Sequence, residues 1–189
     1  MRRSLAVLAA LALLVPGVGA AQSYPVIPLS FHDFRPGMTV AEVSTLASRL
    51  GGSFSCKPST RDRRVQECRG RAAGPELGGP VTLWGSAMDG VLGVLTLSGD
   101  VAPDQLDAWR DYLEAHHGEV DAKVQGPQWM LQWVRRGTMV RLTWRITRGE
   151  RHASISLVHG PTLDNWGTAQ RQAALPASPT TAQPHPADS

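Results

Sequence analysis

The 189-residue sequence predicts an α+β protein built from two tandem repeats, each a helix followed by antiparallel strands, in the order α-ββββ-α-βββ. Two segments, near residues 40–50 and 103–117, carry apolar side chains at helical spacing. Each is followed by glycine and then by stretches in which apolar and polar residues alternate, which is typical of strands with one buried face. We therefore expect each helix to pack on the apolar face of its own sheet.

The first twenty residues have the pattern of a cleavable secretory signal. Two arginines precede an unbroken apolar run over residues 5–15, which is shorter than the roughly 20 residues that a membrane span needs. Small residues before Ala21 favour cleavage at that point. We expect a signal peptide over residues 1–20, no stable membrane span, and a periplasmic or secreted protein whose residues 21–37 form an extended N-terminal segment.

Removal of this signal changes the charge of the chain. The full sequence has 19 Lys and Arg against 16 Asp and Glu, a formal net charge of +3. Without Arg2 and Arg3, 17 basic residues face 16 acidic ones, and the net charge falls to +1. Nucleic acid is not an expected partner of such a chain, and any electrostatic contact has to come from local clustering.

The first repeat is expected over residues 38–99. Thr39 and Glu42 form a capping box at the start of its helix, and Gly51-Gly52 stops the helix. Asp89-Gly90 predicts a tight hairpin turn, because this dipeptide accepts the positive φ that such turns require. The four strands of this repeat are expected at 53–57, 65–70, 81–85 and 91–97.

Two cysteines, Cys56 and Cys68, lie on the first two of these strands, on either side of a polar turn. In an exported protein such a pair favours a disulfide. The bridge would close a loop of about a dozen residues and stabilise the fold by roughly 3 kcal/mol. A redox role is the alternative, but the spacing is not C-x-x-C, so we expect a structural staple.

The second repeat is expected over residues 100–167. Pro103 suits the first position of a helix that ends at Gly118. Three strands follow, at 129–135, 139–147 and 152–159. Turns at Arg136-Gly137 and at Arg148-Gly149-Glu150 connect them.

The second helix has two contrasting faces. Its inner face is expected to carry Leu106, Trp109, Leu113 and His116. Its outer face carries Asp104, Asp107, Asp111 and Glu114. A solvated surface explains this acidic stripe better than a contact for a cation or a basic partner does. Beyond the second repeat, residues 168–189 are rich in Ala, Pro and Thr, and we expect them to form a disordered tail.

The start of the first helix resembles a known family. Pro36-Gly37-Met38-Thr39-Val40-Ala41-Glu42-Val43, followed by Leu50-Gly51, is similar to the Gly-Met-Thr-x-x-x-Val…Leu-Gly helix entry of the SmpA/OmlA (BamE-like) envelope domains. The predicted layout also resembles the β-lactamase inhibitor protein architecture of tandem helix-and-sheet repeats. The resemblance implies an extracytoplasmic protein-binding role without catalysis. The chain lacks the lipobox cysteine of the first family and has a second repeat, so no partner-binding residue is carried over.

The sequence contains no recognisable catalytic or metal-binding motif. It has no H-E-x-x-H, no G-x-S-x-G and no S-x-x-K. His116 and His117 fit the last turn of a helix, where positive charge favours the helix dipole, better than a metal site. We expect no cofactor and no metal. An envelope enzyme of unrecognised type, with a site formed by a histidine and a carboxylate, is the alternative.

Arginine is concentrated late in the chain and is opposed there only by Glu150. The residues are Arg135, Arg136, Arg141, Arg145, Arg148 and Arg151. Strand alternation over residues 140–147 places Arg141 and Arg145 on one sheet face, beside a strand that carries Trp133. Because arginine forks bind carboxylates and phosphates well, this face is a candidate recognition surface. A solvated face that charge protects from aggregation is the alternative.

These observations together predict a non-enzymatic, extracytoplasmic binding or accessory protein. Its binding residues are expected to be Arg135, Arg141, Arg145 and Trp133. Its partner is expected to be an anionic protein surface or an envelope polymer, with Cys56–Cys68 as scaffold.

Overall fold

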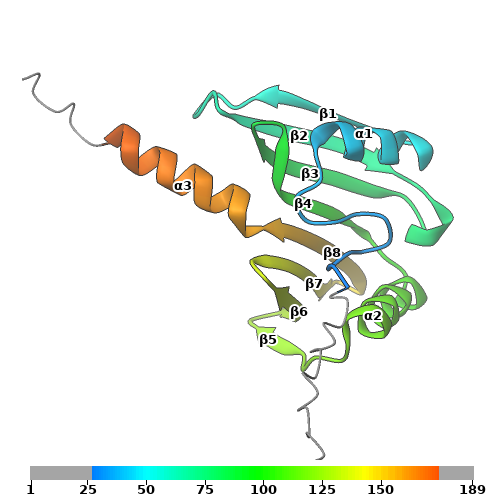
Figure 1. Ribbon diagram of the computed structural model, residues 1–189. Coiled ribbons are helices and arrows are strands. Elements are labelled where there is room, and N and C mark those ends of the chain that lie inside the picture. Colours follow the sequence, from blue (N-terminus) through cyan, green and yellow to red (C-terminus); the bar gives the residue numbers. More distant parts are fainter. Residues whose placement is uncertain (1–26, 175–189) are drawn as a thin grey trace, which may run out of the picture.

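The protein has an α+β fold with one eight-stranded antiparallel sheet, in the strand order β1-β2-β3-β4-β8-β7-β6-β5 (Figure 1). The computed structural model describes residues 27–174, with side chains as far as Thr168. The predicted signal peptide, its cleavage point and residues 175–189 lie outside this part. The predicted fold class is confirmed.

The first half of the sheet follows one helix, and the second half follows another. The first half contains α1 (Val40–Arg49), β1 (Ser53–Pro58), β2 (Val65–Ala72), the short 3-10 helix η1 (Pro75–Leu77), β3 (Val81–Met88) and β4 (Val91–Asp100). The second half contains α2 (Pro103–His117), β5 (Lys123–Gln125), β6 (Gln128–Arg135), β7 (Thr138–Thr147), β8 (Glu150–His159) and α3 (Gly160–Ala174). The second half therefore has four strands rather than the predicted three, because the three-residue β5 pairs with the start of β6.

Helices α1 and α2 cover the same face of a single sheet, whereas separate sheets had been predicted. The last strand, β8, pairs with β4 on one side and with β7 on the other, which joins the two halves. A row of buried side chains crosses this junction without a break: Leu83, Leu97, Ile155, Leu142 and Leu131. This face, together with the buried residues of α1 and α2, forms one hydrophobic core.

The predicted boundaries of α1 are confirmed. Thr39 Oγ1 accepts from the Glu42 amide at 3.2 Å, and the Thr39 amide donates to Glu42 Oε2 at 2.7 Å, which completes the capping box. The Thr39 amide and then the Thr39 hydroxyl, which donates to Glu42 Oε2 at 2.8 Å, hold the pKa of the Glu42 carboxyl below its usual value. Gly51 follows the helix with a φ of +70°, a left-handed conformation that glycine adopts without a steric penalty.

The inner face of α2 differs from the prediction at its end. Trp109, Leu113 and His117 are the buried residues, at a spacing of four. His116 is exposed and stacks on Tyr112, with ring centroids 4.0 Å apart. Trp109 also donates from Nε1 to the Leu77 carbonyl at 2.9 Å, which ties α2 to the first half of the molecule.

The predicted turns and the disulfide are confirmed. Asp89-Gly90, Arg136-Gly137 and Arg148-Gly149 each have positive φ at both residues, as tight hairpins with right-handed twist require. Cys56 and Cys68 are directly opposite each other on β1 and β2 and are bridged. Both lie on the helix-covered side of the sheet, since Cys68 is buried in the core.

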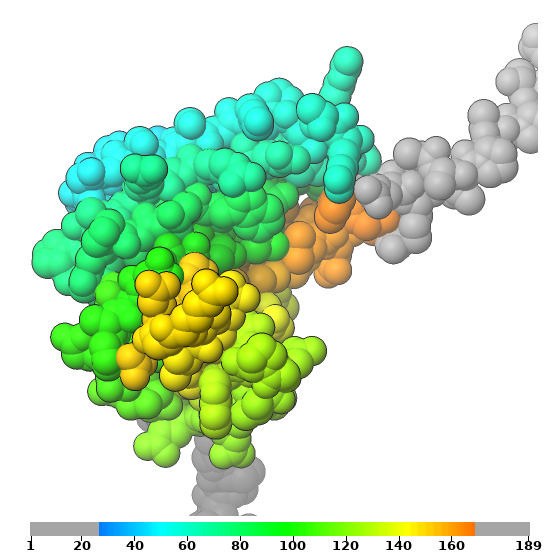
Figure 2. All heavy atoms as spheres, turned by 180° about the vertical axis from the view of Figure 1, so that it is seen from behind, coloured from blue at the N-terminus to red at the C-terminus, as the bar shows by residue number. Residues whose placement is uncertain are grey.

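The chain does not leave the fold as a tail at residue 168. Helix α3 begins directly after β8 and continues to Ala174, so the prediction was wrong for residues 168–174. Leu163 and Thr162 of this helix lie against Gly93, where a larger residue would meet the Leu163 side chain. Figures 1 and 2 show α3 extending from one corner of the molecule. No described helix has the length and apolar content of a membrane span.

Candidate functional site

Within residues 27–174, the face of the sheet opposite α1 and α2 is covered only at one end, where α3 lies near Val65, Ser86 and Met88, and we call it the open face. Figure 2 views the molecule from behind, with the yellow β7–β8 hairpin beside the green strands of the first half. Residues of the open face form straight rows across the strands because every pairing is antiparallel, and the one register shift, between Ser86 and Ala87 of β3, lies outside these rows. One row runs Ser55, Arg69, Trp84, Thr96, Ser156, Arg141, Gln132. The next runs Ser53, Arg71, Thr82, Ser98, Ser154, Thr143, Met130.

The centre of the open face is lined by small hydroxyl side chains. The Thr96 and Ser156 hydroxyls lie 3.2 Å apart across β4 and β8, and those of Thr143 and Ser154 lie 2.8 Å apart across β7 and β8. These hydrogen bonds satisfy the hydroxyls locally. The centre therefore presents a low, uncharged surface on which a partner can lie flat.

Arg141 and Arg145 form one flank of the open face, as the sequence predicted. The Arg141 head is held by Gln132, since Nε and Nη2 both donate to the same amide oxygen, Oε1, at 3.0 and 2.8 Å. Arg145 is exposed and lies in register with Gln128 and His152. In the described part of the chain, no carboxylate forms a salt bridge with either arginine.

Two arginines that the sequence analysis missed form the opposite flank. Arg69 and Arg71 on β2 are exposed and lie in register with Trp84 and Thr82 of β3. The alternation Glu67-x-Arg69-x-Arg71 is the pattern in the sequence that indicates this flank. Four strand spacings separate β2 from β7, so the two flanks are roughly 19 Å apart.

The open face carries more positive than negative charge. Its strand residues include Arg69, Arg71, Arg141, Arg145, Lys57 and Lys123, against Glu67, Asp100 and Glu150. Two of these acids are engaged. Glu67 accepts a hydrogen bond from Ser59 at 2.9 Å, and Asp100 lies 3.0 Å from His152. An acidic partner would therefore find unneutralised arginines at both flanks.

Trp133 and Arg135 do not belong to the open face, which corrects the predicted set of binding residues. Trp133 is only 4% exposed and donates from Nε1 to the Gly118 carbonyl at 2.7 Å. Arg135 donates to the carbonyls of Ile27, at 3.1 Å, and His117, at 2.8 Å. Both residues lie on the same face of β6 as Leu131, toward the helices. There, Trp133 packs at the end of α2, and Arg135 holds the N-terminal segment through Ile27.

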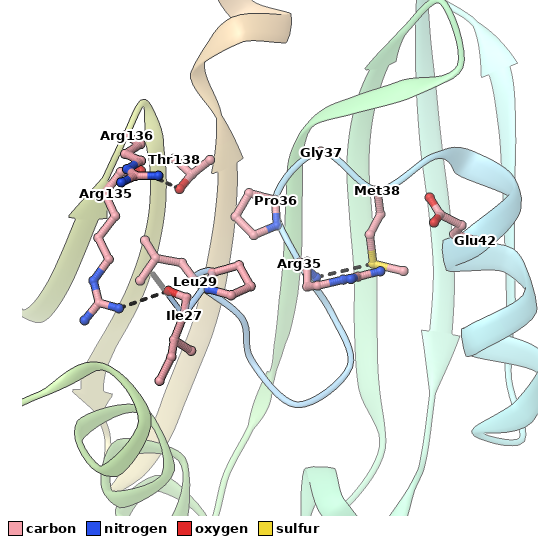
Figure 3. Close-up of a pocket in the computed structure, with 11 residues that line it drawn as sticks. Ile27, Leu29, Arg35, Pro36, Gly37, Met38, Glu42, Arg135, Arg136 and Thr138 are labelled. Atoms are coloured by element: carbon pink, nitrogen blue, oxygen red, sulfur yellow. Dashed lines mark hydrogen bonds between the residues drawn. The ribbon is translucent and has the colours of Figure 1, made fainter. Parts of the chain in front are cut away.

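A cavity of about 390 Å³ opens where the N-terminal segment meets the β6–β7 turn (Figure 3). Its walls include three arginines: Arg35, Arg135 and Arg136. They do not converge, because Arg135 reaches toward Ile27 and away from Arg136, while Arg35 lies on the far side near Met38. We read this cavity as the seam along which the N-terminal segment is attached.

In the described part of the chain, histidines lie at several points, and none is paired with a carboxylate inside a cleft. His152 is beside Asp100 at 3.0 Å, and the two side chains are 46% and 78% exposed. His159 contacts Thr162 at 2.8 Å. Within residues 27–168, no three His, Cys, Asp or Glu side chains are grouped in a way that could hold a metal ion. The arrangement that would favour the enzyme alternative is therefore not formed by these residues.

His117 and His32 have lowered pKa values, and burial is the main cause for both. His117 Nε2 lies 2.7 Å from the Ser30 carbonyl, which fits a neutral ring that donates from this nitrogen. Arg135 nearby further disfavours the charged form. His117 thus joins α2 to the N-terminal segment as an uncharged side chain.

Comparisons with protein-family models, with curated proteins and with solved structures found no match. The resemblance to the BamE-like and β-lactamase inhibitor protein architectures therefore stays a prediction.

Proposed function

We propose that this protein is a non-enzymatic binding or accessory protein that acts outside the cytoplasm and takes an acidic protein surface on its open face. The disulfide Cys56–Cys68 supports the extracytoplasmic location, because such bonds persist in oxidising compartments. A protein partner is favoured over a small molecule because only a partner of protein size can contact both arginine flanks of the open face.

The observation that carries this proposal is the spacing of the arginine flanks. Arg69 and Arg141 lie in the same cross-strand row, roughly 19 Å apart, with Trp84 and the hydroxyls of Thr96 and Ser156 between them. A helix with its side chains is about 10–12 Å wide, so a helix or a hairpin fits between the flanks and a small metabolite does not reach both. Trp84, which is 39% exposed, adds an aromatic anchor of the kind common in protein interfaces.

The test is affinity capture from an envelope extract, followed by calorimetry with the purified partner. We expect R141S/R145S and R69S/R71S each to weaken binding about tenfold, because each removes two charges from the contact. The matched control is R35S/R49S, which removes the same charge from the helix-covered side and leaves affinity within about twofold. Binding should also weaken as salt is raised.

Equal effects of the control and the open-face variants would contradict the proposal, since they would reflect net charge alone. A partner that binds R141S/R145S and R69S/R71S as tightly as it binds the unaltered protein would contradict it as well. Thermal unfolding of every variant confirms that it is folded.

A further inference from the structure

An apolar patch that is largely exposed lies on the helix-covered side of the sheet, beside α2. It consists of Val124, Trp129, Trp144 and Ile146, and we call it the tryptophan corner. Val124, Trp129 and Trp144 are opposite one another on β5, β6 and β7, and Ile146 follows Trp144 on the same strand face. Val124 is 58% exposed and Ile146 is 55% exposed. Apolar surface of this kind marks an interaction site when it is contiguous.

The two tryptophans of the corner are stacked on each other, and among the described residues their indole N–H groups have no acceptor. Their rings are nearly parallel, at 11°, with centroids 6.2 Å apart, and Trp129 is 44% exposed. The core tryptophans behave differently, since Trp109 and Trp133 donate their indole N–H groups to backbone carbonyls. Within the described part of the chain, neither corner indole donates a hydrogen bond. Trp144 is half-buried and packs against the core, whereas Trp129 lies on it with much of its ring exposed.

Carboxylates lie along one side of the corner, next to Trp129 and Trp144. A cavity of about 810 Å³ lies between the corner, α2 and the loop that follows it, and its walls include Glu114, Glu119 and Asp121. Its one basic wall residue is Arg110. The Arg110 guanidinium is already 3.4 Å from both Asp107 and Asp111. Arg151, which is opposite Ile146 on β8, does not line this cavity. The site combines aromatic faces with an excess of negative charge.

We propose that the tryptophan corner binds a cationic side chain, lysine or arginine, presented by a basic segment of a protein partner. The electron-rich faces of Trp129 and Trp144 attract a cation, and the carboxylates of Glu114, Glu119 and Asp121 strengthen that attraction. Val124 and Ile146 contact the apolar residues beside the cation. The charge preference is opposite to that of the open face, so one molecule has two surfaces of different specificity.

The test follows the indole N–H signals of Trp129 and Trp144 by NMR during titration with a short peptide of alternating lysine and leucine. The matched probe is the same peptide with every lysine acetylated, which keeps the length and removes the charge. We expect the lysine peptide to shift both indole signals and the acetylated peptide to leave them in place. Trp129→Ala and the pair E119Q/D121N should each weaken binding about two- to fivefold.

Controls separate this site from the open face. Trp84→Ala removes a similarly exposed tryptophan from the opposite face and should leave lysine-peptide affinity unchanged. R141S/R145S should leave it unchanged too, so failure of either proposal does not decide the other. The proposal is overturned by the absence of indole shifts, by equal shifts with the acetylated peptide, or by equal losses in Trp84→Ala and Trp129→Ala. Shifts with a neutral oligosaccharide that E119Q/D121N does not alter would overturn it in favour of a sugar site.

Discussion

Arg141 and Gln132 face each other across β7 and β6, and the arginine donates twice to one amide oxygen, from Nε at 3.0 Å and from Nη2 at 2.8 Å. The guanidinium is thereby fixed on the open face before any partner arrives. Arg145 lies four residues further along β7, on the same face, and its guanidinium has no such hydrogen bond in the described part of the chain.

This difference predicts unequal roles for the two glutamines on β6. Gln132→Ala frees the Arg141 side chain, so binding has to order it again, and we expect partner affinity to fall about two- to tenfold. Gln128→Ala, beside Arg145, is the matched control and should change affinity by less than about twofold. Calorimetry with the captured partner measures both. A larger loss from Gln128→Ala than from Gln132→Ala would reject the role of Gln132.

Gly37 is a position where alanine should be costly for two separate reasons. Its φ is +79°, and an added Cβ would lie 2.9 Å from the His159 ring. Left-handed backbone and overpacking together predict a loss of about 3 kcal/mol from the free energy of unfolding of Gly37→Ala. Urea denaturation measures this loss.

Gly51 separates the two contributions to that loss. Its φ is +70°, but nothing lies within 4 Å of the added Cβ, so Gly51→Ala should cost only about 1 kcal/mol. Combining Gly37→Ala with His159→Ala should recover part of the difference. Equal destabilisation by Gly37→Ala and Gly51→Ala would show that the His159 contact has no energetic weight.

The neutral state of His117 predicts that stability falls at mildly acidic pH. Its pKa is lowered in the folded protein, so the unfolded chain binds a proton first as the pH decreases. Stability from this residue is complete above the ordinary pKa of 6.5 and is lost as the pH falls toward the folded value. Because the pKa of His32 is also lowered, single variants are needed.

His117→Gln removes this titration and should flatten the slope of unfolding free energy between about pH 7 and pH 5. Urea denaturation at several pH values provides the slope. His116→Gln, at the exposed neighbouring position, is the control and should keep the original slope. An unchanged slope in His117→Gln would place the pH sensitivity elsewhere.

Reduction of Cys56–Cys68 should destabilise the protein without unfolding it. The bridge joins residues 12 apart, and a loop of this size contributes about 3 kcal/mol in the chain-entropy model. Urea denaturation with and without a reductant should show this difference, and C56S/C68S should match the reduced protein. A reduced protein as stable as the oxidised one would mean that the pairing of β1 with β2 is sufficient.

Local chemistry explains what the sequence could predict. The capping box of Thr39, the Gly51 stop and the three hairpin turns depend on neighbouring residues, and all were confirmed. The alternation over residues 140–147 also placed Arg141 on the correct face. Helix α3 was missed because its apolar contacts, such as Leu163 against Gly93, come from a strand far away in sequence.

The candidate site was predicted only in part for a related reason. Because Trp133 and Arg135 are close to Arg141 in sequence, all three were predicted to form one binding surface. The strand register places Trp133 and Arg135 on the helix-covered face and Arg141 on the open face. Arg69 joins Arg141 through four strand pairings, one of which, β4 with β8, crosses between the two halves of the sequence. Such rows depend on the order of strands in the sheet, and no single segment of the sequence contains that order.

The position of β8 has a consequence for the order in which the molecule can assemble. It is the last strand in the described part of the chain, yet it occupies the middle of the sheet between β4 and β7. Strands β1 to β4 can form from local hairpins, but β4 keeps an unpaired edge until about fifty further residues have emerged and β8 docks. The finished sheet ends instead in β1, which carries Lys57 and Pro58, and in the three-residue β5, both poor templates for a second chain. Aggregation is therefore a hazard of the nascent chain, and closure by its final strand removes that hazard.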